Sequence, residues 1–197
     1  DIQKDLINNI HRNYNHIILT NNIRDYLHEK NIDIENITSR EKNQYLAIMA
    51  LDVLLEEKSF DDLISIKLPN NPGRFEIIQN EPLKIIDGAH NIEGVERLLS
   101  DFGQLNDSLF VDLFIGFKKG KDYIDILNLI KGHKPNSINL IQDNTFFEQE
   151  TVAKIASHLE KIEQKYQVVH IDKFMENKNP CILLGSLYLI GEFKKDI

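Results

Sequence analysis

The segment KIIDGAHNIEG (residues 84–94) places three polar side chains directly after a short apolar run. Asp87, His90 and Asn91 bring a carboxylate, an imidazole and a carboxamide within five residues. A carboxylate only accepts hydrogen bonds, whereas an imidazole can donate one or carry charge near neutral pH. A strand that ends in these groups predicts a site for a polar ligand at its carboxyl end.

The elements that must position these residues alternate from Phe75 onward, strand with helix. Strands separated by helices imply right-handed crossovers and a parallel, doubly wound sheet. We therefore predict an α/β fold with a Rossmann-like, mostly parallel sheet, one antiparallel edge strand and helices on both faces. The expected strands cover 75–79, 83–88, 108–117, 137–143, 166–171 and 181–186, and the expected helices cover 91–101, 122–131, 149–164, 173–178 and a last segment from Leu187.

Three further strand ends resemble the first in composition, namely FIGFKKGKD (114–122), IQDNTFF (141–147) and LLGSLY (183–188). Gly88, Gly116 and Gly185 allow sharp turns, and the helix that follows offers unpaired backbone amides. In an open parallel sheet such loops meet at one edge. This edge therefore predicts a site for a small anionic ligand.

Organisation changes near residue 68. NQYLAIMALDVLLEE (43–57) has helical apolar spacing, and Thr38 with Glu41 forms a possible capping box before it. LPNNPGR (68–74) reads as a linker. We predict a first region, 1–67, that is a helical remnant of another domain with its linker, and a second domain, 68–197.

Composition limits the function. The chain has 197 residues and a formal net charge of −8, which disfavours a general nucleic-acid or anionic-membrane surface. Cys181 is the only cysteine, so no internal disulfide forms and we expect a cytoplasmic protein. No apolar run approaches the roughly 20 residues of a membrane-spanning helix. The absence of an initiator Met suggests a fragment or a processed chain.

PGRFEIIQNEPLKIIDGAHNIEG (72–94) resembles the C-terminal-domain signature of folylpolyglutamate synthases and bifunctional dihydrofolate synthases, in the Mur ligase superfamily. ILLGSLYLIGEF (182–193) is similar to the terminal Gly-Ser-Leu-Tyr helix of this family. The segment 43–57 is similar to the helix that closes its central domain. These matches follow the family order over about residues 43–197.

The resemblance implies a ligase that adds L-glutamate to tetrahydrofolate or dihydropteroate. ATP phosphorylates a folate carboxylate, and the glutamate amine attacks the acyl phosphate. It implies ATP and Mg²⁺ as cofactors, whose main ligands lie outside this chain, and the protein's own N-terminal ATPase domain as partner. No Gly-x-x-x-x-Gly-Lys-Ser/Thr pattern occurs in the sequence, so we expect this chain alone to be inactive, and we expect a monomer.

Three residues resemble nucleotide-site residues of the family. Arg74 resembles an arginine that reaches the nucleotide phosphates, and the alternative is a surface arginine in a linker. Asp87 resembles an aspartate that accepts hydrogen bonds from the ribose, and the alternative is a helix cap. His90 resembles the catalytic histidine facing the γ-phosphate or acyl phosphate, and the alternative is an ordinary loop histidine.

Four further assignments remain open between ligand contact and structure. Asn91 either contacts the nucleotide or caps the next helix. Ser186 either binds the incoming glutamate or caps the last helix. Lys121 resembles the lysine of an Asp-Lys-Asp segment that pairs with a carboxylate or phosphate, and a solvated lysine is the alternative. Asn43 resembles an asparagine near the adenine, and a structural role is the alternative.

The sequence also departs from the family pattern. Ile92 replaces a proline, Asn71 an aromatic residue, Gly120 the first acid of Asp-Lys-Asp, and Ser39-Arg40 a His-Gln pair. Loss of the acid at 120 weakens the role predicted for the lysine loop. The second hypothesis is therefore a non-catalytic binding or regulatory relative with the same fold. An NAD-binding domain is disfavoured because no Gly-x-Gly-x-x-Gly follows a strand.

Overall fold

The computed structural model describes residues 27–30, 32, 38–54, 62, 64–65, 71–106, 110–142 and 152–195. Contacts divide the chain into a first unit, Asp1–Pro69, and a second unit, Asn70–Ile197. The assignment of the first unit to a remnant of an ATPase domain stays a prediction.

In the first unit, helix α3 covers Ser39–Leu54. The predicted capping box is present, because the Thr38 amide donates to the Glu41 carboxylate (2.7 Å) and the Glu41 amide donates to the Thr38 hydroxyl (3.3 Å). Ile48 and Met49 are buried on this helix. The prediction placed the helix start at residue 43, one turn late, because the first turn is polar and carries no apolar periodicity.

The second unit is built on one six-stranded sheet in the order β1-β2-β6-β3-β4-β5. Every strand except the two at the edges is almost wholly buried, as expected for a sheet covered on both faces. The strands are β1 (Glu76–Gln79), β2 (Lys84–Asp87), β3 (Asp112–Ile115), β4 (Ser137–Ile141), β5 (Gln167–Val169) and β6 (Cys181–Leu184).

Strand pairing confirms the predicted fold class. β1 pairs antiparallel with β2, and the turn between them contains a cis Glu81–Pro82 peptide bond. The remaining pairs, β2 with β6, β6 with β3, β3 with β4 and β4 with β5, are parallel. The sheet is therefore mostly parallel with one antiparallel edge strand.

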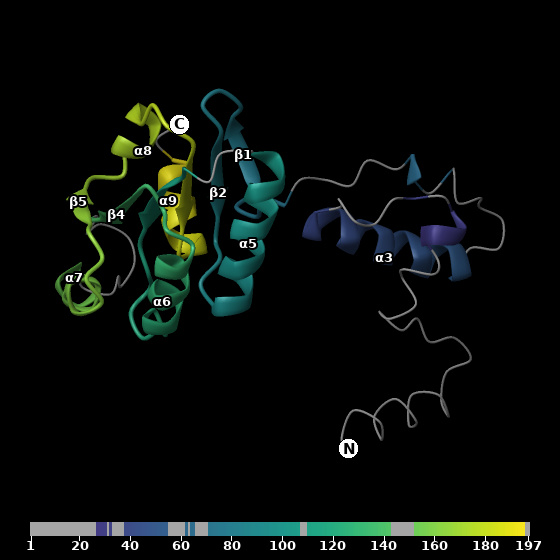
Figure 1. Cartoon of the computed structure of the whole chain (residues 1–197). Helices are drawn as coiled ribbons and strands as arrows, with labels where there is room; N and C mark the ends of the chain where they lie inside the picture. Colours follow the sequence, from purple (N-terminus) through teal and green to yellow (C-terminus); the bar gives the residue numbers. More distant parts are fainter. Residues whose placement is uncertain are drawn as a thin grey trace, which may run out of the picture. The chain divides into compact units, whose positions relative to one another are not determined.

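Helices cover both faces of this sheet (Figure 1). The side chains of α5, α6 and α7 pack into one apolar cluster with Leu113, and those of α8 and α9 pack into a second cluster with Phe114. The helices are α5 (Ile92–Leu105), α6 (Ile124–Gly132), α7 (Val152–Lys161), α8 (Lys173–Glu176) and α9 (Leu187–Phe193). The structure thus confirms helices on both faces.

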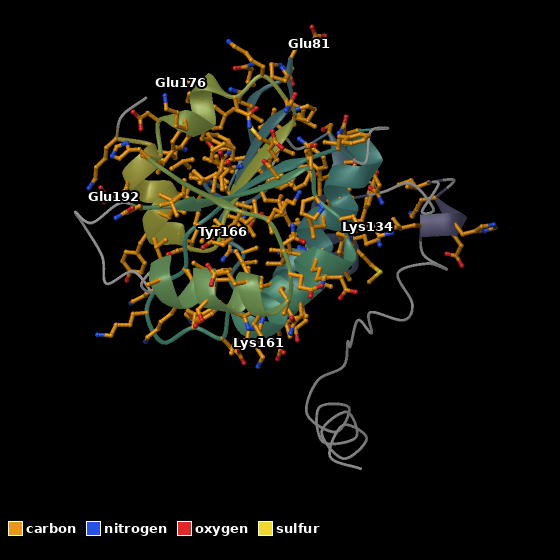
Figure 2. All side chains as sticks on the ribbon, turned by 60° about the vertical axis from the view of Figure 1, so that its left-hand side comes forward. Glu81, Lys134, Lys161, Tyr166, Glu176 and Glu192 are labelled. Atoms are coloured by element: carbon orange, nitrogen blue, oxygen red, sulfur yellow. The ribbon has the colours of Figure 1, made fainter. Side chains whose placement is uncertain are left out.

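Helix α5 shows why this sequence folds as it does. Its buried residues Val95, Leu98, Leu99 and Phe102 recur at three- and four-residue spacing, so one face meets the sheet. Each such side chain contributes about 1.5–3 kcal/mol when it is fully buried. Several charged side chains lie at the periphery of the second unit in Figure 2, among them those of Glu81, Lys161, Glu176 and Glu192. None of the described helices is long and apolar enough to cross a membrane.

A buried carboxylate organises the amino ends of the strands. Asp112, which is 4% exposed, accepts four side-chain hydrogen bonds of 2.7–2.9 Å, from Asn136, Ser137, Asn177 and Asn179. Burial alone would raise its pKa, but these four donors outweigh burial and hold the pKa of Asp112 below its usual value. The network joins three loops at the edge opposite the predicted site.

Lys84 is buried at the same edge. Its ammonium donates to the carbonyl of Phe174 (3.1 Å) and to that of Met175, and it lies over the Phe174 ring. These carbonyls belong to the last turn of α8, so Lys84, at the start of β2, caps the C-terminal end of that short helix. Burial lowers the pKa of Lys84 and raises that of the neighbouring Cys181 to about 12.

Candidate functional site

The predicted site residues follow two adjacent parallel strands, β2 and β6. Asp87 ends β2, with His90 and Asn91 after it, and Ser186 follows β6. The helix after β2 packs on one face of the sheet and the helix after β6 on the other. The two loops therefore diverge at the topological switch point, where open parallel sheets bind ligands.

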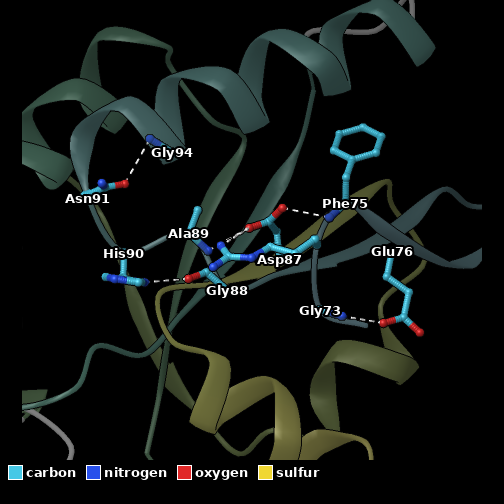
Figure 3. Close-up of polar contacts among 10 residues, drawn as sticks. Gly73, Phe75, Glu76, Asp87, Gly88, Ala89, His90, Asn91 and Gly94 are labelled. Carbon is cyan, nitrogen blue, oxygen red and sulfur yellow. Dashed lines mark hydrogen bonds and ion pairs between the residues drawn. The ribbon is translucent and has the colours of Figure 1, made fainter. Parts of the chain in front are cut away.

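Asp87 holds the loop that carries Arg74. One carboxylate oxygen accepts from the Phe75 amide (2.7 Å) and the other accepts from the Ala89 amide (2.7 Å). Arg74 Nη1 lies 3.9 Å from Asp87 Oδ1. Figure 3 shows the carboxylate between these two backbone segments. Asp87 does not cap a helix in this arrangement, because its two carboxylate oxygens bind backbone amides of two different loops.

Exposure separates the roles that Arg74 and Asp87 can have. The Arg74 side chain is 42% exposed and the Asp87 side chain only 5%. Burial raises the pKa of Asp87 above its usual value, although the two amides and the Arg74 guanidinium act in the opposite direction. The Arg74 guanidinium is thus accessible to an anionic ligand, whereas the buried Asp87 carboxylate binds two backbone amides. A contact of Asp87 with the ribose remains a prediction.

Two glycines bring the loops into backbone contact. The Gly88 amide donates to the Gly73 carbonyl (2.8 Å). A Cβ on Gly88 would lie 2.4 Å from Leu187 Cδ2 and 3.2 Å from the Leu187 amide nitrogen. Gly73 has a positive φ of 68°, which glycine adopts without strain. The Pro-Gly-Arg loop and the loop after β6 therefore both contact the Asp-Gly-Ala-His-Asn loop.

His90 is half-buried and oriented by its own loop. Its Nδ1 lies 2.8 Å from the Gly88 carbonyl oxygen. Because a carbonyl only accepts, Nδ1 carries the proton and Nε2 is the nitrogen left for a ligand. The His90 ring and the Asp87 carboxylate point in different directions (Figure 3). A neutral His90 then offers an acceptor at Nε2, and a protonated His90 offers a donor.

Asn91 and Ser186 both have capping roles in the structure. The Asn91 side chain accepts from the Gly94 amide (3.1 Å) at the start of α5, and the Ser186 hydroxyl accepts from the Tyr188 amide (3.1 Å) at the start of α9. Asn91 is exposed and Ser186 is 4% exposed. The capping alternatives are thus present, and a ligand contact by either residue remains a prediction.

Lys121 is not brought to these loops by any described contact, and Asn43 belongs to the first unit. Lys121 is exposed in the turn after Gly120, which has a φ of 79° and open space where a Cβ would be. Asn43 is exposed on α3, in the first unit. Residues 143–151, which include most of the predicted IQDNTFF strand end, lie outside the described residues.

The sequence reasoning overlooked Lys118. Its ammonium lies 4.7 Å from the centroid of the Tyr188 ring, in the first turn of the helix that Ser186 caps. Lys118 belongs to the segment FIGFKKGKD (114–122), two residues after Gly116. Gly116 could have indicated Lys118 in the sequence, because this glycine marks the turn after β3 and strand β3 is adjacent to strand β6.

Metal ligands are not gathered in the described part of the chain. No group of three or more His, Cys, Asp and Glu residues there could hold a metal ion. The exposed Arg74 guanidinium suits phosphate oxygens, so the residues present fit part of a nucleotide site.

Comparison with known proteins gives one relative in sequence. No family model matches the chain. The chain is 29% identical, over 170 residues, to the dihydrofolate synthase/folylpolyglutamate synthase of Bacillus subtilis (strain 168); the match covers 80% of this chain and 39% of the relative. The chain therefore spans about two fifths of the length of this curated relative.

Solved structures agree in fold. Mycobacterium tuberculosis folylpolyglutamate synthase, complexed with ADP and AMPPCP, matches with a TM-score of 0.64 at 17% identity, over 79% of this chain and 39% of that one. E. coli FolC, in complex with DHPP and ADP, matches with a TM-score of 0.61 at 21% identity, over 79% of this chain and 38% of that one. At such identities the structures show the fold alone. The Bacillus relative confirms the predicted resemblance in sequence to a dihydrofolate synthase/folylpolyglutamate synthase, and the solved structures agree with it in fold.

Proposed function

We propose that this chain provides the C-terminal part of an ATP-dependent ligase that adds L-glutamate to a folate, tetrahydrofolate or dihydropteroate. One observation carries the proposal. The Pro-Gly-Arg, Asp-Gly-Ala-His-Asn and Gly-Ser loops, which are far apart in sequence, contact one another at the switch point of the sheet. These are the segments in which the sequence resembles the ligase family.

The chemistry assigns separate tasks to these residues. ATP supplies the phosphoryl group that activates the folate carboxylate; the glutamate amine then forms the amide bond and phosphate leaves. Arg74, oriented by Asp87, binds phosphate oxygens through its planar guanidinium. His90 presents Nε2 beside the same loop, where a protonated ring donates to the negative charge that develops. Ser186 and the neighbouring backbone bind the incoming glutamate.

The phosphate cradle and the main Mg²⁺ ligands belong, in this proposal, to a nucleotide-binding domain that the chain does not supply. Two observations on relatives support a nucleotide and a folate-type ligand. The Mycobacterium tuberculosis structure contains ADP and AMPPCP, and the E. coli structure contains DHPP and ADP. The isolated chain should then show no folate-dependent ATP hydrolysis. We place the intact enzyme in the cytoplasm as a monomer.

A chimera tests the proposal. The part of the Bacillus subtilis enzyme that this chain matches is replaced by this chain, and ATP- and folate-dependent incorporation of L-glutamate is measured. Activity that disappears in the Arg74→Ala chimera supports the ligase. A folded chimera that binds nucleotide but incorporates no glutamate would favour the second candidate, a non-catalytic relative. The presence of Gly120 where the family has an acidic residue favours this candidate.

A further inference from the structure

The turn that carries Arg74 is held by a carboxylate on each side of that residue. Before Arg74, the Gly73 amide donates to Glu76 Oε2 (2.6 Å). After it, the Phe75 amide donates to Asp87 Oδ2 (2.7 Å). Figure 3 shows both contacts. The backbone direction at Arg74 therefore depends on Glu76 as well as on Asp87.

This turn needs such contacts because its backbone is unusual. Gly73 and Phe75, which flank Arg74, have positive φ angles of 68° and 44°. A positive φ is unfavourable for a residue with a side chain, so Phe75 keeps it only while its surroundings impose it. Loss of a carboxylate contact should let the turn relax. The Arg74 guanidinium would then leave its present direction.

The Glu76 carboxylate is itself held by a residue from the end of the chain. Lys194, 118 residues later in the sequence, donates to Glu76 Oε1 (2.6 Å). The Lys194 side chain is 34% exposed and that of Glu76 is 21% exposed. Burial acts to raise the pKa of Glu76, but Lys194 and the Gly73 amide outweigh burial and lower this pKa. Glu76 is thus ionised, with one oxygen for each partner.

Helix α9 fixes the position of Lys194. The Lys194 amide donates to the Ile190 carbonyl (3.0 Å). Ile190 also packs on the turn, because a Cβ on Gly73 would lie 3.0 Å from Ile190 Cγ2. The helix that positions Lys194 therefore contacts the same turn that Glu76 holds. Most surface ion pairs contribute little to stability, so a pair in this place is better explained by what it orients.

We propose that Glu76 and Lys194 form a positioning pair for Arg74, an inference that rests on the proposed function. The pair fixes the Gly73 amide and with it the turn, so the exposed Arg74 guanidinium is presented to phosphate in one direction. Neither Glu76 nor Lys194 has to touch the phosphate. A guanidinium binds phosphate oxygens best when its planar fork faces them, so a turned side chain loses affinity without losing charge.

The test measures binding of inorganic tripolyphosphate to the full 197-residue chain, from the ¹H–¹⁵N NMR shifts of the backbone amides of residues 73–75. The variants are Lys194→Met, Lys194→Arg, which keeps the charge, and Glu76→Gln, which removes the charge of the partner. Lys195→Met is the matched control, because Lys195 also pairs with a glutamate, Glu192 of α9 (2.8 Å). Urea denaturation checks that each variant is folded.

Glu76→Gln separates positioning from simple electrostatics. Through charge alone, Glu76→Gln would strengthen the binding of an anion and Lys194→Met would weaken it. Positioning predicts that both substitutions weaken binding, by about fivefold, which is what one net hydrogen bond contributes. The double variant should then bind no more weakly than either single variant. Lys194→Arg and Lys195→Met should bind nearly as tightly as the unaltered chain.

Arg74→Ala separates failure of the inference from failure of the proposed function. If Arg74→Ala abolishes binding but Glu76→Gln binds as tightly as the unaltered chain or more tightly, the inference is overturned and the proposed function stands. Equal losses in Lys194→Met and Lys195→Met overturn it in the same way. If tripolyphosphate shifts no amide of the turn in the unaltered chain, or shifts them equally in Arg74→Ala, the phosphate role of Arg74 fails and the inference fails with it.

Discussion

The Asp87 carboxylate accepts a 2.7 Å hydrogen bond from the backbone amide of Phe75, twelve residues earlier in the chain. Phe75 has a positive φ of 44°, a conformation that costs a residue with a side chain about 1–2 kcal/mol. The bond to Asp87 offsets that cost and holds the turn that projects Arg74. Asp87 therefore acts on the predicted phosphate contact through the backbone as well as through its charge.

The first prediction concerns this connection. Asp87→Ala leaves the Phe75 and Ala89 amides without their buried acceptor, and each unsatisfied group costs about 1–3 kcal/mol. We expect the free energy of unfolding, measured by urea denaturation at pH 7, to fall by at least about 2 kcal/mol. Glu96→Gln, on the exposed side of α5, should change it by less than about 0.5 kcal/mol. Equal effects of both substitutions would contradict the connecting role.

Much of the fold could be predicted because its elements carry local signals. The spacing of Val95, Leu98 and Phe102 indicates a helix in any context, and the capping residues Asn91 and Ser186 mark where helices begin. The strand ends were less predictable. Of the expected strand 108–117, residues 108 and 109 lie outside the described residues, and Asp112–Ile115 form β3. Val111 and Phe117 are buried beside the strand without belonging to it, and burial alone does not show where a strand ends.

Contacts between distant segments explain what the sequence could not show. The helix expected at 173–178 ends at Glu176. There the ammonium of buried Lys84, ninety residues earlier in the sequence, donates hydrogen bonds to carbonyls of the last turn of this helix. In the site, the sequence singled out Lys121 from a family pattern, whereas the contact with α9 belongs to Lys118. Neither pairing has a signature in local spacing.

The second prediction is a dependence of stability on pH through Asp112. Its hydrogen bonds hold the pKa of the folded carboxylate below the unfolded value of about 3.9. The stability that this group contributes is therefore complete above about pH 4 and is lost as the pH falls through the lower folded pKa.

Asp112→Asn removes that contribution. It should lower the free energy of unfolding by about 1–3 kcal/mol at pH 7, and the difference from the unaltered chain should shrink below about pH 4. Urea midpoints between pH 7 and pH 2 measure both effects. Asp125→Asn, at an exposed position, is the control. A difference that stays constant over the whole pH range would exclude Asp112 as the titrating group.

The third prediction concerns catalysis by the active chimera. His90→Ala should lower kcat about 10²-fold with a smaller effect on the KM for L-glutamate, because a donor at Nε2 strengthens its contact as charge develops in phosphoryl transfer. Steady-state kinetics with varied ATP and L-glutamate measure this. A raised glutamate KM at unchanged kcat would instead place His90 in ground-state recognition.

Ser186→Ala should show the opposite kinetic pattern, a raised glutamate KM with ATP binding nearly unchanged. Because the hydroxyl also caps α9, the same substitution should lower the free energy of unfolding by about 1 kcal/mol. Ser186→Asn retains a capping side chain. If its glutamate KM equals that of the unaltered chimera, the hydroxyl serves the helix and not the substrate.

The final prediction ranks three glycine-to-alanine substitutions by what the added Cβ meets. At Gly185 it would lie 2.5 Å from a backbone oxygen, at a φ of 116°. At Gly88 it would lie 2.4 Å from Cδ2 and 2.5 Å from Cγ of the Leu187 side chain, and at Gly103, within α5, nothing lies within 4 Å. Gly103→Ala should stabilise the protein by about 0.5–1 kcal/mol. Gly185→Ala should cost more than about 2 kcal/mol, because strained backbone and a backbone clash add together, and Gly88→Ala should lie between. Thermal denaturation of the three variants gives the order, and a Gly185→Ala variant as stable as the unaltered chain would contradict it.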